Sequence, residues 1–273
     1  QSRGYDITAI SGSSMGAVVG GMYAAGTLSD YKKWVNKLTK LDVLGLMDFT
    51  LGTKGFLKGE KLFHEMERLG FIPDIDIESL KIPVSILATD IVQNKEIVFT
   101  KGKLNEALRA SIAIPNIFTP VEKGNSLLVD GGVLSPLPLN HLKTEKGDVI
   151  VAVDINALIA YSPKKVSDEK LSGLSKKEKT TFELLKEKWC ELFEGDEKSK
   201  LEKSSNLGYF DMFTRSYQVM QNRITRYALD ANPPDVLIEI SKDACGTFEY
   251  YRAKEMIDLG QTSCAKAFDK AKL

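Results

Sequence analysis

One short segment near the amino terminus constrains the fold of this chain more than any other. The apolar run Tyr5–Ile10 leads into Ser-Gly-Ser-Ser-Met-Gly at residues 11–16, and a helical pattern of small residues follows. This order predicts a strand, a tight turn and a helix, with Ser14 at the apex, as in the G-x-S-x-G nucleophile elbow. Glycine at Gly12 and Gly16 lets the backbone pass closely on either side of the serine.

The turn at Ser14 is either a catalytic elbow or an ordinary turn rich in Gly and Ser. It raises the Ser14 hydroxyl above the edge of the sheet, and the Met15 N–H at the helix start points to where an oxyanion would form. A Gly- and Ser-rich turn without a catalytic role would show the same letters. The strand before it and the helix after it favour a working elbow.

Strand-like and helix-like segments alternate along the chain. β-branched runs predict strands at 5–10, 83–90, 96–100, 126–130, 148–154 and 235–240. Helical periodicity covers 14–25, 29–41, 59–69, 103–112, 177–193, 210–231 and 248–270. Several strands are continuous apolar runs, as in strands buried on both faces. The sequence therefore predicts an α/β fold with a mostly parallel sheet covered by helices.

The stretch 161–207 differs from the rest, because it is dense in Lys and Glu and poor in strand-forming residues. Within it, one helical face carries Phe182, Leu185, Trp189, Leu192 and Phe193. That face either docks on the core or forms a lid or membrane-contacting element beside the active site. We therefore expect a core at 1–160, a charged helical insertion at 161–207, and the carboxy-terminal part of the same core at 208–273.

Composition excludes several classes of protein. The chain has 37 Lys+Arg and 37 Asp+Glu, so no overall basic field would recruit nucleic acid. Its three cysteines lie far apart, which indicates neither a zinc site nor a disulfide framework. No stretch is long and apolar enough to span a membrane, and no signal peptide is visible. We expect a cytoplasmic protein, with peripheral membrane contact as an option.

A serine nucleophile needs a base, and the chain has two histidines, His64 and His141. His64 lies in a surface-helix pattern and His141 follows a proline-rich segment, so both are expected to be structural or exposed. Asp130 is the better candidate, because an apolar strand delivers it directly into two glycines. A carboxylate in such a place needs a partner. A plain Asp-Gly-Gly turn is the alternative.

These residues resemble the patatin-like phospholipase family, specifically its bacterial members. Gly12-Ser13-Ser14-Met15-Gly16 is followed by Asp130-Gly131-Gly132, and the segment 109–120 between them, Arg-Ala-Ser-Ile-Ala-Ile-Pro through Phe-Thr-Pro, is also similar to the family. The chain departs from many members in lacking an asparagine shortly after the two glycines. The resemblance covers nearly the whole chain except 161–207.

The resemblance implies a three-layer α/β/α sandwich and hydrolysis of acyl esters, chiefly of lipids. It implies Ser14 as nucleophile and Asp130 as its sole partner, in a Ser–Asp dyad. It also implies a glycine-rich oxyanion loop ahead of the elbow. Gly4 is the only glycine before Gly12, so we expect that this loop lies upstream of the sequence given and that the chain by itself is inactive.

Other assignments stay open at this level. Arg109 and Ser111 are tentative cleft residues, with Arg109 equally plausible as a structural ion-pair donor. No cofactor is expected, and no metal site, because the strand-end acids Asp6, Asp90 and Asp154 are typical of caps and turns. The alternative function is a catalytically silent module that binds lipid or protein on the same fold. Acyl transfer to an acceptor other than water would use the same residues, and oligomeric state is not predicted.

Overall fold

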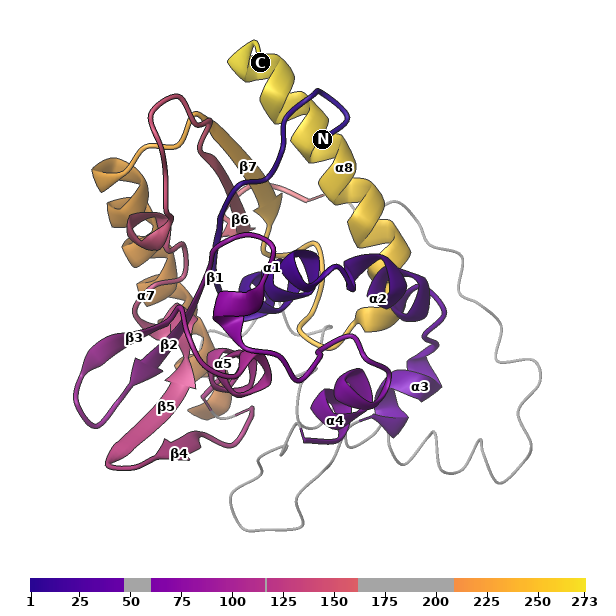
Figure 1. Ribbon diagram of the computed structural model, residues 1–273, viewed down its shortest axis with the longest axis vertical. Coiled ribbons are helices and arrows are strands. Elements are labelled where there is room, and N and C mark those ends of the chain that lie inside the picture. Colours follow the sequence, from indigo (N-terminus) through magenta and orange to yellow (C-terminus); the bar gives the residue numbers. More distant parts are fainter. Residues whose placement is uncertain (47–59, 116, 162–208) are drawn as a thin grey trace, which may run out of the picture. The chain divides into compact units, whose positions relative to one another are not determined.

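A computed structural model describes residues 1–46, 60–115, 117–161 and 209–273 (Figure 1). The chain divides into two compact units, one made of residues 1–160 with 221–273 and the other of residues 161–220. The predicted insertion at 161–207, including its apolar helical face, falls outside the described residues except for Tyr161. The three-part domain division therefore stays a prediction.

The central sheet belongs to the first unit and is built around one buried strand. Its members are β1 (Ile10–Ser13), β2 (Val84–Asp90), β3 (Lys95–Phe99), β4 (Val121–Lys123) and β5 (Ser126–Asp130). β2 is buried along its whole length and pairs with β1, β3 and β5. β6 (Val151–Ala157) and β7 (Val236–Ser241) form a second, two-stranded sheet.

The fold is of the predicted α/β class, but its sheets are mixed and not mostly parallel as predicted. β1 with β2 and β6 with β7 are parallel pairs, whereas β3 and β5 run antiparallel to β2 and β4 runs antiparallel to β5. Short connections explain two of the antiparallel pairs, β2 with β3 and β4 with β5. Four residues join β2 to β3 and two join β4 to β5, and such links permit only antiparallel neighbours.

Helices α1 (Met15–Ala25) and α5 (Leu104–Ser111) pack on β1 and β2 and against each other. Their contact buries Val18, Met22 and Leu108 with Ile86 of β2. Each such side chain stabilises the fold by roughly 1.5–3 kcal/mol through loss of apolar surface to water. This core holds the first helix rigidly behind the elbow.

The remaining helices are α2 (Leu28–Val35), α3 (Lys40–Gly45), α4 (Glu60–Arg68), α7 (Tyr209–Ala231) and α8 (Ala253–Ala271). The sequence predicts one helix over 29–41, but the structure has a break between α2 and α3. Thr39 causes it: its hydroxyl accepts the Asp42 N–H at 3.2 Å, and Asp42 accepts the Thr39 N–H at 2.8 Å. This reciprocal capping box starts a new helix.

The first strand begins later than predicted. Residues 5–9 lie outside the strand, and pairing starts at Ile10 opposite Val84, where β2 itself begins. Among the described residues, the other boundaries shift by only a few residues from the prediction, and β4 is an additional strand; the helix predicted at 177–193 lies outside the described residues. β4 has three residues, two of them the exposed Glu122 and Lys123, so it lacks an apolar pattern.

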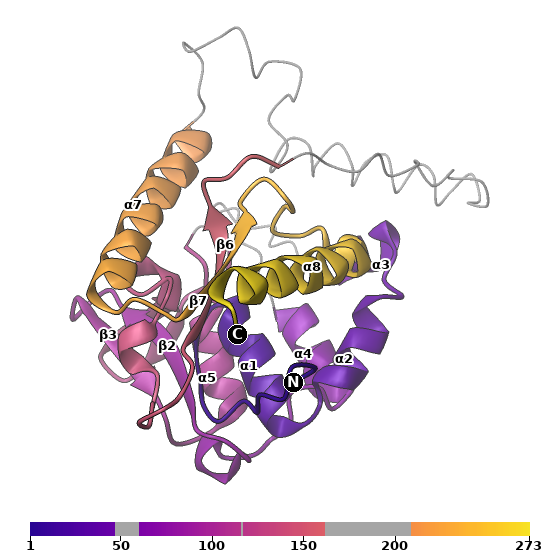
Figure 2. The same ribbon diagram turned by 90° about the horizontal axis from the view of Figure 1, so that it is seen from above.

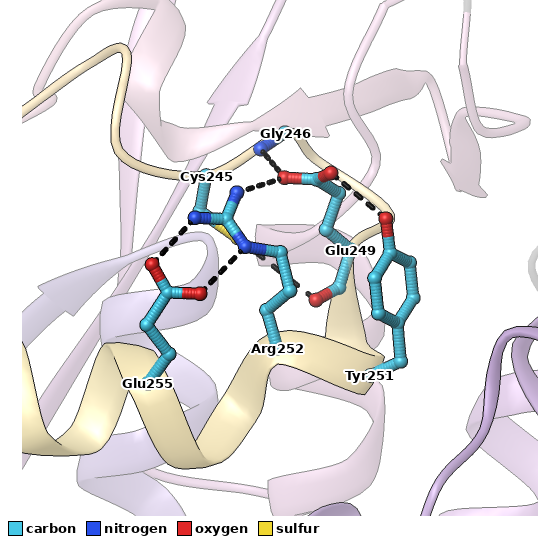
Figure 3. A network of polar contacts seen from close by, with 6 residues as sticks. All are labelled: Cys245, Gly246, Glu249, Tyr251, Arg252 and Glu255. Atoms are coloured by element: carbon cyan, nitrogen blue, oxygen red, sulfur yellow. Dashed lines mark hydrogen bonds and ion pairs between the residues drawn. The ribbon is translucent and has the colours of Figure 1, made fainter. Parts of the chain in front are cut away.

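An ion-pair network anchors the start of α8, which lies along β7 (Figures 2 and 3). The Arg252 guanidinium donates to Glu249 at 2.5 Å and to both oxygens of Glu255 at 2.8 and 2.9 Å. Glu249 also accepts the Gly246 N–H and the Tyr251 hydroxyl, each at 2.9 Å. The network fixes the loop between β7 and α8. Its two carboxylates also neutralise the charge of Arg252, which would otherwise be repelled by the positive end of the α8 dipole.

Candidate active site

Ser14 stands at the turn between β1 and α1 in a conformation that few L-residues adopt. Its backbone has φ 54° and ψ −128°, which costs about 1–3 kcal/mol and persists only when surrounding contacts enforce it. Two contacts do so. The Ser14 N–H donates to the Ser111 hydroxyl at 2.9 Å, and the Ser14 carbonyl accepts the Ala17 N–H at 3.0 Å.

The two elbow glycines have different roles. A Cβ on Gly12 would lie 2.6 Å from the Ala17 nitrogen and 2.6 Å from the Gly16 carbonyl carbon, both backbone atoms. Gly12 is therefore required by close approach, as expected. A Cβ on Gly16 would meet nothing within 4 Å, so the expected steric need for glycine at that position is not seen.

Asp130 is the last residue of β5 and is held on three sides. Its side chain is buried, with 2% of the residue exposed, and Oδ1 accepts the Gly132 N–H at 2.6 Å. Its own N–H donates to the Ala113 carbonyl at 2.9 Å. A Cβ on Gly131 would lie 2.3 Å from the Leu87 carbonyl oxygen, so only glycine lets the chain leave β5 along this path.

The sheet brings Ser14 and Asp130 together. β3 occupies one edge of β2 at residues 86–90, so β1 and β5 share the opposite edge, at 84–87 and 88–90. β1 is parallel to β2 and β5 antiparallel, so the two strands run toward each other. Their carboxyl ends meet where Ser13 pairs with Leu87 and Asp130 pairs with Ala88.

The carboxyl group of Asp130 is chemically unusual. Burial raises its pKa to about 6, against the opposing effects of the Ser14 hydroxyl and the Gly132 N–H, which favour the ionised form. Oδ2 is buried and forms no hydrogen bond of standard geometry. The Ser14 hydroxyl is near enough to lower this pKa, although Oδ2 accepts no hydrogen bond.

Met15 is the first residue of α1. The N–H groups of a helix's first turn have no partner within the helix and sit at the positive end of its dipole. The Met15 N–H is therefore available to stabilise negative charge that develops beside Ser14.

The two tentative cleft residues have other uses in the structure. Ser111 is fully buried and accepts the Ser14 N–H, so its hydroxyl supports the elbow instead of facing a cleft. Arg109 donates to the carbonyl and the hydroxyl of Thr119 at 3.1 and 3.0 Å. Arg109 thereby braces the segment that carries the chain from α5 toward β4.

Both histidines bond elsewhere. His64, whose side chain is 76% exposed, lies 3.1 Å from Glu67, and His141 lies 2.7 Å from Glu96. Neither imidazole hydrogen-bonds to Ser14 in the described structure. Asp90 accepts the Val92 and Gln93 N–H groups, which is the turn role expected for it.

Two supports of the site were missed in the sequence. The Ser13 hydroxyl donates to the Ser135 carbonyl at 2.5 Å, and Gln221 of α7 donates to the Gly132 carbonyl at 3.0 Å. A cavity of about 250 Å³ adjoins the first contact, lined by Ser135, Leu137 and Ile224 among others. Ser13 stands within the motif, but its partner is 122 residues away and no local pattern identifies it.

The chain is similar to proteins of a known family. The family model described as patatin-like phospholipase matches residues 1–143, just over half of the chain. An uncharacterized NTE family protein of Mycobacterium tuberculosis is 30% identical over 306 residues, which cover 98% of this chain and 84% of the relative. The chain belongs to the patatin-like phospholipase family.

More distant relatives carry an activity in their names. Lysophospholipase NTE1 of Candida glabrata is 28% identical over 62% of this chain, and lysophospholipase nte1 of Emericella nidulans is 28% identical over 64%. The chain aligns with only 10% and 12% of those two proteins. Family and relatives support lipid acyl hydrolysis as the general activity. Of the described helices, none is both long and apolar enough to cross a bilayer.

Proposed function

We propose that this protein is a serine acyl hydrolase that cleaves fatty-acyl esters of lipids through Ser14 and Asp130. One observation carries the proposal: a buried acid, with its pKa raised to about 6 and one oxygen left without a hydrogen bond, lies beside the serine of a strained elbow. Strained backbone and a perturbed acid in one place are typical of active sites.

The first half of the reaction forms an acyl-enzyme. Ser14 Oγ attacks the ester carbonyl carbon while its proton passes to the Asp130 carboxylate. The Met15 N–H donates to the oxyanion, a contact of a kind worth about 3–4 kcal/mol in other enzymes. As the tetrahedral intermediate collapses, the bond to the alcohol breaks and Asp130 returns the proton to the leaving oxygen.

The second half regenerates the enzyme. Asp130, again ionised, takes a proton from water as the water oxygen attacks the acyl carbon. Collapse breaks the bond to Ser14 Oγ, which takes the proton back from Asp130, and the fatty acid leaves. A carboxylate with a pKa near 6 is a better proton acceptor than one near 3.9 and is still mostly ionised at neutral pH.

Hydrolysis of a p-nitrophenyl acyl ester and of a lysophospholipid by the full-length protein tests this proposal. Ser14→Ala and Asp130→Asn should each lower kcat/KM at least a hundredfold, while the double variant His64→Ala/His141→Ala keeps activity within about threefold. Unchanged turnover in Ser14→Ala would refute the proposal. Loss in the histidine variant with retention in Asp130→Asn would replace the dyad with a triad.

The proposed lipid substrates imply that the protein works at a lipid surface. Acyl esters of lipids reside in membranes or micelles, so the protein should contact a lipid surface during turnover. Fatty-acid release from vesicles of a phospholipid, compared with the same lipid dissolved by detergent, tests this. Activity on soluble short-chain esters with none on either lipid form would restrict the protein to esterase chemistry.

A further inference from the structure

The segment 111–113 at the carboxyl end of α5 contacts both members of the proposed dyad. The Ser111 hydroxyl accepts the Ser14 N–H at 2.9 Å. Two residues later, the Ala113 carbonyl accepts the Asp130 N–H at 2.9 Å. Ser111 and Ala113 have no exposed surface, so water does not compete for these bonds. A single short segment is therefore bonded to two chain positions that lie 116 residues apart in sequence.

The two bonds hold the backbone at Ser14 and at Asp130, so together they influence the distance between the hydroxyl and the carboxylate. Ser14 follows β1 and Asp130 ends β5, and each strand is fixed to β2 only up to its last residue. Beyond those ends, the backbone direction at Ser14 depends on a conformation with φ 54°. Without the Ser111 bond, the part-buried Ser14 N–H would lose its hydrogen-bond partner, and the elbow would relax toward a common conformation.

The segment itself is rigidly placed. Leu108 and Ala110 of α5 are almost fully buried in the core, and α5 packs on α1, β2 and β5. After the helix, the Ile112 N–H bonds to the Leu108 carbonyl at 3.1 Å and the Ala113 N–H to the Ala110 carbonyl at 3.3 Å. Both acceptors therefore belong to one well-packed body, and movement of one would move the other.

We infer that Ser111 is a positioning residue: through the α5 carboxyl end, it fixes the Ser14 backbone relative to Asp130 and so sets the separation of hydroxyl and carboxylate. This inference rests on the proposed function. Ser111 itself touches no reacting atom. Its contribution should appear in kcat and in the rate at which Ser14 is acylated, with KM for a small ester little changed.

The test compares Ser111→Ala with a matched buried serine. Ser241 also has 5% or less of its surface exposed, and its hydroxyl donates to the Ile159 carbonyl at 2.7 Å and accepts the Asp243 N–H. Ser241→Ala therefore removes a comparable bond away from the elbow. Ser111→Cys keeps nearly the same volume with a weaker acceptor, and it serves if Ser111→Ala fails to fold.

The first measurement is the second-order rate of modification by a fluorophosphonate in the full-length protein. We expect rates in the order wild type, Ser111→Cys, Ser111→Ala, with the last about tenfold to a hundredfold slower than wild type, and Ser241→Ala within about twofold of wild type. Equal rates in wild type and Ser111→Ala, or equal slowing in both alanine variants, would overturn the inference.

The second measurement does not depend on activity. Hydrogen–deuterium exchange of the Ser14 amide should be at least tenfold faster in Ser111→Ala than in wild type, and unchanged in Ser241→Ala. Unaltered protection in Ser111→Ala would also overturn the inference. If wild type fails to react with the fluorophosphonate but the amide loses protection as expected, the proposed function is what fails, and Ser111 still orders the elbow.

Discussion

Asp130 carries most of the chemistry at the scale of single residues, because burial raises its pKa to about 6. A carboxylic acid that must be ionised to accept a proton gives activity that rises with pH through its pKa. We expect kcat/KM for a soluble ester to increase about tenfold per pH unit below 6 and to level off above it. A pH profile from 4.5 to 8 measures this. A midpoint near 4 would mean that Asp130 is not the group that limits the reaction.

The same shift predicts how Asp130 affects stability. The acid has a higher pKa when folded than when unfolded, so its stabilising effect is complete below about pH 4 and is lost as pH rises toward 6. Above pH 6 the ionised acid costs about 2–3 kcal/mol. In urea unfolding over pH 4.5 to 8, the stability of Asp130→Asn relative to wild type should rise up to about pH 6 and stay level above it. A constant difference across that range would contradict the stated cause.

Motif residues could be predicted from sequence, but their supports could not. Ser14 and Asp130 are recognisable because each has glycines beside it and an apolar strand before it. The role of Ser111 depends on where the end of α5 lies relative to the elbow, 97 residues away. No local pattern carries that information, so the sequence indicates Ser111 only as a tentative cleft residue, whereas its hydroxyl contacts the elbow.

At the scale of secondary-structure elements, the packing of β1 against the start of α1 makes glycine necessary at Gly12 but not at Gly16. Gly12→Ala would drive a Cβ against the backbone at Gly16 and Ala17, and a backbone cannot give way as a flexible side chain can. We expect it to cost about 3 kcal/mol or more, or to prevent folding. Gly16→Ala, in open space within a helix, should be neutral or stabilise by up to about 1 kcal/mol. Equal effects in thermal unfolding would show that the close approach at Gly12 is not real.

Element boundaries show what local sequence can predict and where it falls short. The Thr39-x-x-Asp42 pattern is a capping signal visible in the sequence, so the break between α2 and α3 was predictable. The meeting of β1 and β5 at one edge of β2 was not, because it follows from strand pairing at long range. The expectation that Asp130 partners Ser14 rests on the apolar strand that delivers it into two glycines and on the family resemblance. Strand order supplies its physical cause.

At the scale of the whole molecule, the two ends of the chain are tied together. Arg3 donates to the carbonyls of Leu273 and Ala265, at 2.7 and 3.4 Å, and pairs with Asp269. A cation beside the carboxyl end of α8 stabilises that helix end through the helix dipole.

We therefore expect Arg3→Ala to lower the free energy of unfolding by about 1 kcal/mol. Lys33→Ala is the control, because Lys33 forms a single exposed ion pair with Asp30 and should change stability by less than about 0.5 kcal/mol. Urea unfolding of both variants decides the matter. An Arg3→Ala variant no less stable than Lys33→Ala would show that the ends are not joined in solution.

Covalent capture of the nucleophile tests the central claim most directly. The full-length protein is treated with a fluorophosphonate at pH 7.5, digested, and mapped by mass spectrometry. We predict one adduct, on Ser14, at least a hundredfold slower to form in Asp130→Asn and formed at the wild-type rate in His64→Ala/His141→Ala. An adduct on another serine, or an undiminished rate in Asp130→Asn, would contradict the Ser14–Asp130 pair.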